Sequence, residues 1–251
     1  MDESAHKVPE AERNQTKMNV KLERCPWWGE EIAMDECFEY FLENFGPVLD
    51  IKPVPESAFK KYQGVLPDQL LTYWRAVGWG GFARGLFWLV NPEEWDDPME
   101  AMLDETGFLE RDAYHVIARN AFGDLWLWGA KTGRSLSILS TRGMVFPSMP
   151  VPSFGDRGID FEMQLFFMGL EVNTVDLIDD NQIPLFDRAL KKLGQLEPHE
   201  VYGFVPLPAL GGACDLKYLQ KVEAATYMDM LAQSTPMRVM PDYAAIADGR
   251  A

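Results

Sequence analysis

Residues 114–146, which read YHVIARNAFGDLWLWGAKTGRSLSILSTRGMVF, decide the class of fold. This stretch contains short apolar segments at residues 114–119, 125–128, 136–139 and 144–146. Turn-forming residues stand between them at the spacing of β-hairpins, and these are Phe122-Gly123-Asp124, Lys131-Thr132-Gly133 and Arg142-Gly143. Short apolar segments with this spacing predict an antiparallel meander.

Helical patterns stand on both sides of the predicted meander. Asp35 can cap a helix whose apolar residues recur every three or four positions as far as Phe45. Further helices are expected after Pro67, after Asn91-Pro92 and, beyond the meander, within residues 161–170, 185–193 and 217–233. We therefore predict an α+β fold, in which an antiparallel sheet carries packed helices in two closely associated subdomains.

A glycine-rich stretch at residues 78–85, GWGGFARG, follows a predicted helix instead of opening one. A phosphate-binding loop needs its glycines before a helix N-terminus, where free N–H groups point at the anion. We therefore expect a backbone turn here that lets Trp79 and Phe82 pack.

The composition is strongly acidic. The 251 residues include 23 Lys and Arg against 39 Asp and Glu, which gives a formal net charge of −16. Direct binding of nucleic acid is not expected, because DNA carries one negative charge per ~1.7 Å of its axis. No apolar run approaches the roughly 20 residues that span a bilayer, and the first 24 residues lack the apolar core of a signal peptide. We expect a cytoplasmic protein with no membrane contact.

No constellation of residues indicates catalysis or a metal site. Cys25, Cys37 and Cys214 are odd in number and far apart, as is typical of reduced thiols. The three histidines are isolated, with neither the spacing of a zinc site nor a nucleophile beside them in a familiar pattern. We expect no enzyme activity, no catalytic residue, no metal and no cofactor.

The carboxylates gather in two clusters. The first extends from Glu93 to Asp112 with Arg111 as its single basic residue, and the second extends from Glu171 to Asp187 with none. Three interpretations remain open for these clusters, namely a solvated face, a docking surface for a basic protein and a metal site. The order of the acidic residues does not match the loop of an EF-hand.

Several blocks of the sequence resemble known families. Residues 44–47, 66–74, 78–82, 85–92 and 118–125 are similar to the GAD-like domain, and the blocks LPDQLLTYWR and ARNAFGDL are the most specific of them. Residues 200–206, 210–212 and 221–222 resemble the C-terminal domain of the type VI secretion immunity protein family. We accordingly expect a flexible N-terminal arm (1–33), a GAD-like domain (34–150), the immunity-protein C-terminal domain (151–236) and a C-terminal tail (237–251).

The resemblance implies an antitoxin. Proteins of this two-domain type protect a bacterium from a type VI effector, typically a DNase, by binding it in the cytoplasm, and the family has no catalytic residues to carry over. A nuclease attracts phosphates and tends to be basic, so an acidic inhibitor gains association rate from its opposite charge. We expect a cognate toxin, a nuclease, as the partner of the two clusters and of exposed tryptophans beside them. The residues expected to face it are Glu93, Glu94, Asp96, Asp97, Trp79, Trp95, Asp176, Asp179 and Asp180.

Two other functions remain open. A carboxylate-based, metal-dependent hydrolase would need two or three acidic groups that converge within about 2.0–2.6 Å of a cation. A small-molecule sensor would hold its ligand in the aromatic-rich first domain. Tight stoichiometric binding of a divalent cation would favour the first, and a ligand retained through purification would favour the second.

Overall fold

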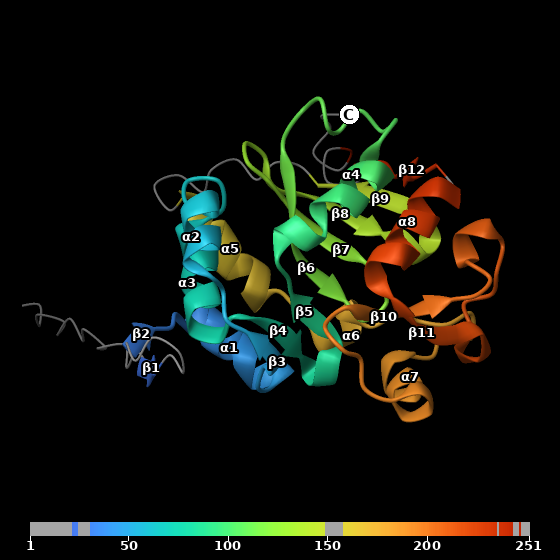
Figure 1. Ribbon diagram of the computed structural model, residues 1–251, viewed down its shortest axis with the longest axis horizontal. Helices are drawn as coiled ribbons and strands as arrows, with labels where there is room; N and C mark the ends of the chain where they lie inside the picture. The colour runs from blue at the N-terminus through green and yellow to red at the C-terminus, as the bar shows by residue number, and fades with distance from the viewer. Residues whose placement is uncertain (1–21, 25–30, 149–157, 235, 243–245, 247–251) are drawn as a thin grey trace, which may run out of the picture.

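A sheet of eight strands forms the centre of the protein (Figure 1). The structure, a computed structural model, describes residues 22–24, 31–148, 158–234, 236–242 and 246. Neighbouring strands run antiparallel, except that β12 is parallel to β9. In spatial order the strands are β12 (Arg238–Val239), β9 (Met144–Pro147), β8 (Gly133–Leu139), β7 (Leu125–Gly129), β6 (Tyr114–Asn120), β5 (Phe87–Leu89), β4 (Trp79–Phe82) and β3 (Leu49–Lys52).

The predicted meander is confirmed as β6, β7, β8 and β9. Leu127 of β7 lies opposite Val116 on one side and Leu136 on the other, and all three side chains are buried. Most residues of β6 and β7 are buried whichever way they point. Such strands belong to a sheet that is covered on both faces, which agrees with the α+β class.

Helices lie on both sides of the sheet (Figure 1). Helices α1, α3 and α5 pack against one another, while α4 packs against α8 and β6. The α-helices of the described residues are α1 (Glu36–Phe45), α2 (Glu56–Tyr62), α3 (Asp68–Val77), α4 (Asp96–Leu103), α5 (Gly158–Met168), α6 (Val172–Val175), α7 (Phe186–Leu193) and α8 (Ala224–Ser234). Short 3₁₀-helices connect several elements, and they are η1 (Ala83–Gly85), η2 (Pro92–Glu94), η3 (Ser140–Arg142), η5 (Pro208–Leu210) and η6 (Leu216–Tyr218).

Helix α1 begins and ends as its sequence predicts. The Asp35 side chain accepts hydrogen bonds from the backbone N of Cys37 and of Phe38, at 3.0 and 3.1 Å. These bonds satisfy two of the donors that a helix N-terminus leaves free. Gly46 ends the helix with φ 73°, a conformation that glycine adopts without steric cost.

The glycine-rich stretch 78–85 forms a strand, so the expectation of a turn was wrong for most of it. Residues Trp79–Phe82 are β4, which pairs with β3 and β5 inside the sheet. A Cβ on Gly80 would lie 2.7 Å from the carbonyl oxygen of Leu49, and one on Gly81 would lie 3.0 Å from the Trp88 ring. The glycines are therefore needed for the close approach of β3 and of Trp88, rather than for a change of chain direction.

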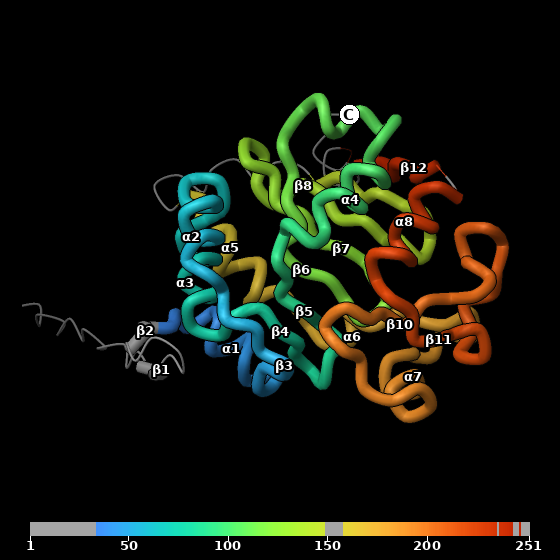
Figure 2. The backbone as a smooth tube through the Cα atoms, in the orientation of Figure 1, coloured from blue at the N-terminus to red at the C-terminus, as the bar shows by residue number. Residues whose placement is uncertain are grey.

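The core is continuous between the two expected subdomains. Helix α5, from the second of them, packs its Phe167 against Phe38 and Phe41 of α1, at ring-centroid distances of 4.9 and 5.1 Å. Figure 2 shows the gold α5 beside the blue α1 and the cyan-green α3. The two subdomains are thus closely associated, because an aromatic cluster takes side chains from both.

Outside the large sheet, the described residues form two small antiparallel sheets. β1 (Leu22–Arg24) pairs with β2 (Glu31–Ala33), within the segment expected to be an arm, and the rest of residues 1–30 lies outside the described residues. β10 (Glu200–Phe204) pairs with β11 (Leu219–Glu223). The expected C-terminal tail contains β12, whose Arg238 N donates to Gly143 O at 2.8 Å. This part of the tail is therefore a strand of the main sheet.

Candidate functional site

The first acidic cluster begins with two carboxylates that are already paired. Glu93 and Glu94 lie on η2 and form ion pairs of 2.7 Å with Lys61 and Lys52. All four side chains remain about half exposed, so these pairs are screened by water and contribute little to stability. Asn91 begins η2 by accepting a hydrogen bond from Glu93 N, as its position before Pro92 predicts.

Asp96 and Asp112 of the same cluster support the fold. Asp96 lies at the start of α4, where its carboxylate is 3.0 Å from Nδ1 of His115 on β6. Asp112 is buried and accepts hydrogen bonds from the hydroxyl and the backbone N of Thr132. Burial opposes its ionisation, but these bonds and others from the backbone of residues 113 and 131 hold its pKa below the usual value. Both carboxylates thus connect α4 and its following loop to the sheet.

The remaining carboxylates of the first cluster are exposed, and none forms an ion pair with another residue in the described part of the chain. Three of them occupy positions i, i+3 and i+7 along α4 and its end, so they share one face of the helix. Figure 1 shows α4 near the surface of the molecule. We call this group the acidic ridge, and it consists of Asp97, Glu100, Asp104, Glu105 and Glu110.

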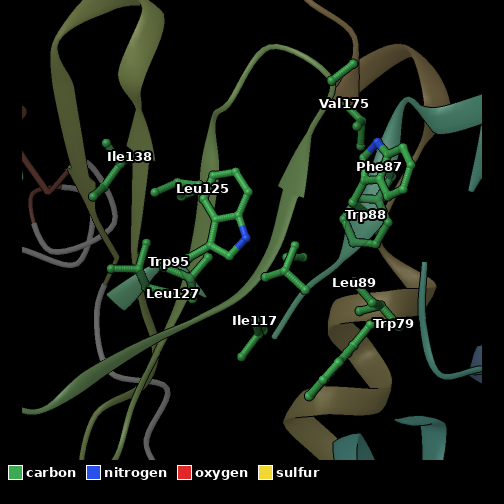
Figure 3. Packing of buried hydrophobic residues seen from close by; sticks show 14 of the residues in the cluster. Trp79, Phe87, Trp88, Leu89, Trp95, Ile117, Leu125, Leu127, Ile138 and Val175 are labelled. Atoms are coloured by element: carbon green, nitrogen blue, oxygen red, sulfur yellow. The ribbon is translucent and has the colours of Figure 1, made fainter. Parts of the chain in front are cut away.

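Trp79 and Trp95 are buried, so the expectation of exposed tryptophans was wrong. Only 4% of Trp79 and 6% of Trp95 is exposed. Trp79 packs edge-on against Trp74, with 5.4 Å between the ring centroids. Trp95 lies in the interior beside Arg119, and Figure 3 shows both tryptophans among the packed residues of the core. They belong to the packing of the sheet and cannot lie flat on a partner's surface.

Arg119 holds an unusual position between two tryptophans. Its guanidinium carbon lies 4.7 Å from the Trp88 ring centroid and 5.2 Å from that of Trp95, and the side chain is fully buried. It donates to the carbonyl oxygens of Asn120 and Pro198, at 3.1 and 2.8 Å. Burial lowers the pKa of Arg119 to about 9, still above neutral pH. The residue therefore connects β6 with the loop before β10 as a buried cation.

Three of the four aspartates of the second cluster are held by the chain itself. Both oxygens of Asp176 accept from the backbone N of Phe186 at the start of α7. Asp179 is buried and accepts from Arg188 Nη1 at 2.7 Å, as well as from two backbone N–H groups. Asp180 is exposed and accepts from Cys214 N at 3.0 Å. These residues order the loop between α6 and α7.

A small cleft of about 240 Å³ brings together three of the residues expected to face the toxin, Trp79, Glu94 and Trp95. Trp88, Pro198 and His199 also line it. The Lys52–Glu94 ion pair involves two lining residues. The volume is below the roughly 300–1,000 Å³ of sites for drug-sized ligands. This cleft has room for a small group only.

A larger cleft of about 560 Å³ lies between elements from the two halves of the chain. Its lining comes from α1 and β3, from η1, and from α6 and α7. We call it the junction cleft. Of the residues expected to face the toxin, Asp176 alone lies here, together with Glu43, Phe45, Arg84, Phe186 and Asp187.

Arg84 and Glu43 had no assigned role on the basis of the sequence. The available signal was the order Ala83-Arg84-Gly85, a cation between small residues directly after a glycine-rich strand. Its meaning depends on Asp187, the ion-pair partner of Arg84, which lies 103 residues further along the chain. No local pattern could have connected the two.

Among the described residues, no three His, Cys, Asp or Glu side chains converge as a metal site would require. The thiols of Cys37 and Cys214 are free, and Cys25 lies outside the described residues. None of the described helices has the length and apolarity to cross a bilayer. The described residues therefore contain no carboxylate cluster of the kind that a metal-dependent hydrolase needs.

Comparisons with known proteins agree with the two halves of the fold. Residues 36–142 match the family model of the GAD-like domain, and residues 160–235 match the model described as "T6SS immunity protein Tdi1, C-terminal". The fold is similar to that in the crystal structure of Atu4351 from Agrobacterium tumefaciens, with a TM-score of 0.72 and 22% sequence identity over 80% of this chain and 91% of that chain. No curated protein matches the chain significantly. Most of the chain is thus similar to two known domains, the GAD-like domain over residues 36–142 and the C-terminal domain of the type VI secretion immunity protein Tdi1 over residues 160–235.

Proposed function

We propose that this chain is an immunity protein that binds and neutralises a cognate type VI secretion toxin in the cytoplasm, and that the toxin is a DNase. The observation that carries the proposal is the match of residues 160–235 to the immunity-protein domain. Binding is sufficient for protection, because a nuclease whose DNA-binding surface is covered cannot reach its substrate. In this role the chain needs no catalytic residue, cofactor or contact with nucleic acid.

The acidic ridge is the surface that we assign to the first encounter with the toxin. Its carboxylates are exposed and unpaired among the described residues, whereas Glu93 and Glu94 beside it are neutralised by lysines. A nuclease needs positive potential to attract phosphates. Opposite charges on two partners accelerate their association and make its rate depend on salt. The net charge of −16 acts in the same direction over longer distances.

Charge reversal on the ridge tests this assignment. We expect Glu100→Lys combined with Glu105→Lys to slow association with the toxin about tenfold at low salt and to flatten the dependence of the rate on ionic strength. The partner would be a nuclease-inactive form of the cognate type VI effector. Stopped-flow or surface-based kinetics at several salt concentrations would measure the rate constants.

A matched variant separates the effect of charge on the acidic ridge from the effect of the net charge of the chain. Glu36→Lys combined with Asp68→Lys changes the net charge equally at exposed, unpaired carboxylates on other elements. We expect this control to slow association less than twofold. Equal slowing by the two pairs would contradict the ridge and leave only the net charge. A toxin that does not bind the wild-type chain, and cells that the chain does not protect, would contradict the immunity function itself.

A further inference from the structure

The lining of the junction cleft combines apolar and acidic residues. Phe45 and Phe186, which are almost fully buried, are among its apolar residues. Glu43, Asp176 and Asp187 are its acidic residues, and Arg84 is the single basic residue of the lining. The volume of about 560 Å³ lies within the range of sites that accept a ligand or a large side chain. The site therefore carries an excess of negative charge beside apolar side chains.

Asp176 has no cation as its partner. It accepts hydrogen bonds from backbone N–H groups, and it forms no ion pair with any basic residue of the described chain. The residue is half-buried, where a carboxylate loses part of its hydration. A cation that enters the cleft would therefore gain more from Asp176 than from a carboxylate on the open surface.

Arg84 shows what kind of cation the cleft accepts. Its guanidinium pairs with Asp187, and its carbon lies 5.9 Å from the centroid of the Phe186 ring. The backbone of Ala83 and Arg84 has φ values of 48° and 60°, a left-handed conformation that costs energy in residues other than glycine. A hydrogen bond of 2.8 Å from Gln195 Nε2 to Arg84 O helps to hold this turn. The chain thus maintains a strained turn that places one guanidinium over an aromatic ring and beside a carboxylate.

We propose that the junction cleft receives an arginine side chain of the toxin, with its stem against Phe45 and Phe186 and its guanidinium on Asp176 and Glu43. This inference rests on the proposed function, because it names a contact with the same toxin. Arginine fits better than lysine because its planar group stacks on aromatic rings and can bind two carboxylates at once. The cleft would then hold two guanidinium groups, Arg84 on Asp187 and the incoming one on Asp176 and Glu43, which have no cationic partner among the described residues.

The test compares two half-buried aspartates. Asp176→Asn keeps an oxygen for the Phe186 N–H group but removes the charge, and Asp215→Asn makes the same change outside the cleft at a residue that also accepts a backbone hydrogen bond. With the nuclease-inactive toxin in calorimetry at pH 7.5, we expect Asp176→Asn to weaken binding at least about tenfold. Asp215→Asn should bind within about twofold of the wild type.

A second pair of variants fills the cleft without changing charge. Asn173 lines the cleft and is exposed, so Asn173→Trp places a large ring in it. Asn181→Trp adds the same ring at an exposed position outside the lining. We expect only the first to weaken binding, again by about tenfold or more. Thermal melting of each variant would establish that it is folded.

An arginine scan of the toxin identifies the occupant. We expect one Arg→Ala change in the toxin to weaken binding to the wild-type chain and to cause no further loss with Asp176→Asn. If only a lysine shows this coupling, the assignment to arginine is wrong. If the wild type binds the toxin and neither Asp176→Asn nor Asn173→Trp differs from its control, the cleft is not a contact and the proposed function still stands. If the wild type does not bind the toxin, both proposals are wrong.

Discussion

The acidic ridge of the first cluster and the loop aspartates of the second cluster have opposite relationships to the fold. On the acidic ridge, carboxylates such as Glu100 and Glu105 extend into solvent without a basic partner among the described residues. In the second cluster, Asp176, Asp179 and Asp180 accept hydrogen bonds from the chain. A count of carboxylates therefore does not distinguish a surface that can attract a partner from a loop that uses its carboxylates for its own order. The positions of backbone N–H donors make that distinction.

The largest effect is expected inside the first cluster, at its tryptophan. Trp95→Ala removes a buried ring beside Arg119, so we expect it to lower the free energy of unfolding by about 3–5 kcal/mol in urea denaturation. Asp97→Ala, two residues further on and exposed, should change it by less than about 0.5 kcal/mol. Similar losses in the two variants would mean that Trp95 is not part of the core.

The next effect is expected at the buried aspartate of the second cluster. Asp179→Ala leaves the backbone N–H groups of Asn181 and Ile183 without this acceptor and removes the carboxylate partner of Arg188. We expect the Tm to fall on the order of 5–10 °C in calorimetry. Asp179→Asn keeps an oxygen that can accept from these backbone N–H groups, so its Tm should fall by about half as much.

The pH dependence at Asp179 has a defined sign. The ion pair with Arg188, with help from the backbone of Ile183, holds the pKa of Asp179 below its usual value. The stability that it contributes is therefore present above the pKa of the unfolded chain, near 3.8, and is lost as the pH falls through the lower value of the folded chain. Asp179→Asn should remove this acid-dependent part.

Asp176 should behave in the opposite way. Burial raises its pKa to about 6, and the nearby carboxylate of Asp187 adds to this increase, although bonds from the backbone N–H groups of residues 177, 185 and 186 oppose it. Arg84 and Glu43 line the same cleft with opposite charges. Because this pKa is raised, ionisation of Asp176 destabilises the folded protein. The free energy of unfolding therefore falls as the pH rises from about 4 to about 6 and stays at the lower value above that range.

Asp176→Asn is therefore expected to stabilise the free protein. After allowance for the partial exposure of the carboxylate, we expect a gain of about 1–2 kcal/mol at pH 7.5 that shrinks towards zero at pH 4. Urea denaturation of the wild type and the variant across this range measures it. A variant that is more stable and yet binds the toxin more weakly would indicate a residue retained for binding. A loss of stability at pH 7.5 would show instead that the charge supports the start of α7.

The parts of the fold that were predicted from the sequence depend on local signals. Asp35 and Asn91 bond to backbone N–H groups two or three residues away, so their helix starts are visible in a short window. The meander of β6 to β9 was equally visible, because each hairpin turn stands between the strands that it connects. Strand β4 was missed because its glycines serve contacts with Leu49 and Trp88, which no local turn pattern reveals.

For the candidate site, the negative charge could be predicted from the sequence, but not which carboxylates are engaged by other residues. The partner of Asp180 is the backbone N of Cys214, 34 residues away, and the partner of Asp96 is His115, 19 residues away. Whether a carboxylate is free or engaged follows from such tertiary contacts, which a single sequence does not display. The junction cleft is a still stronger example, because its walls come from segments more than 100 residues apart, joined by Arg84 and Asp187.

The smallest effect is expected for the ion pair between Glu94 of the first cluster and Lys52. The pair of Glu94 with Lys52 is 2.7 Å long but leaves more than half of each side chain exposed, so water and salt screen it. A double-mutant cycle with Glu94→Gln and Lys52→Met should give a coupling energy below about 1 kcal/mol that disappears in 1 M NaCl. A coupling that is larger and insensitive to salt would mean that the pair is shielded from water. In that case Glu94 on η2 would be a carboxylate that orders the chain, like the aspartates of the second cluster. Only the carboxylates from α4 onwards would then face solvent.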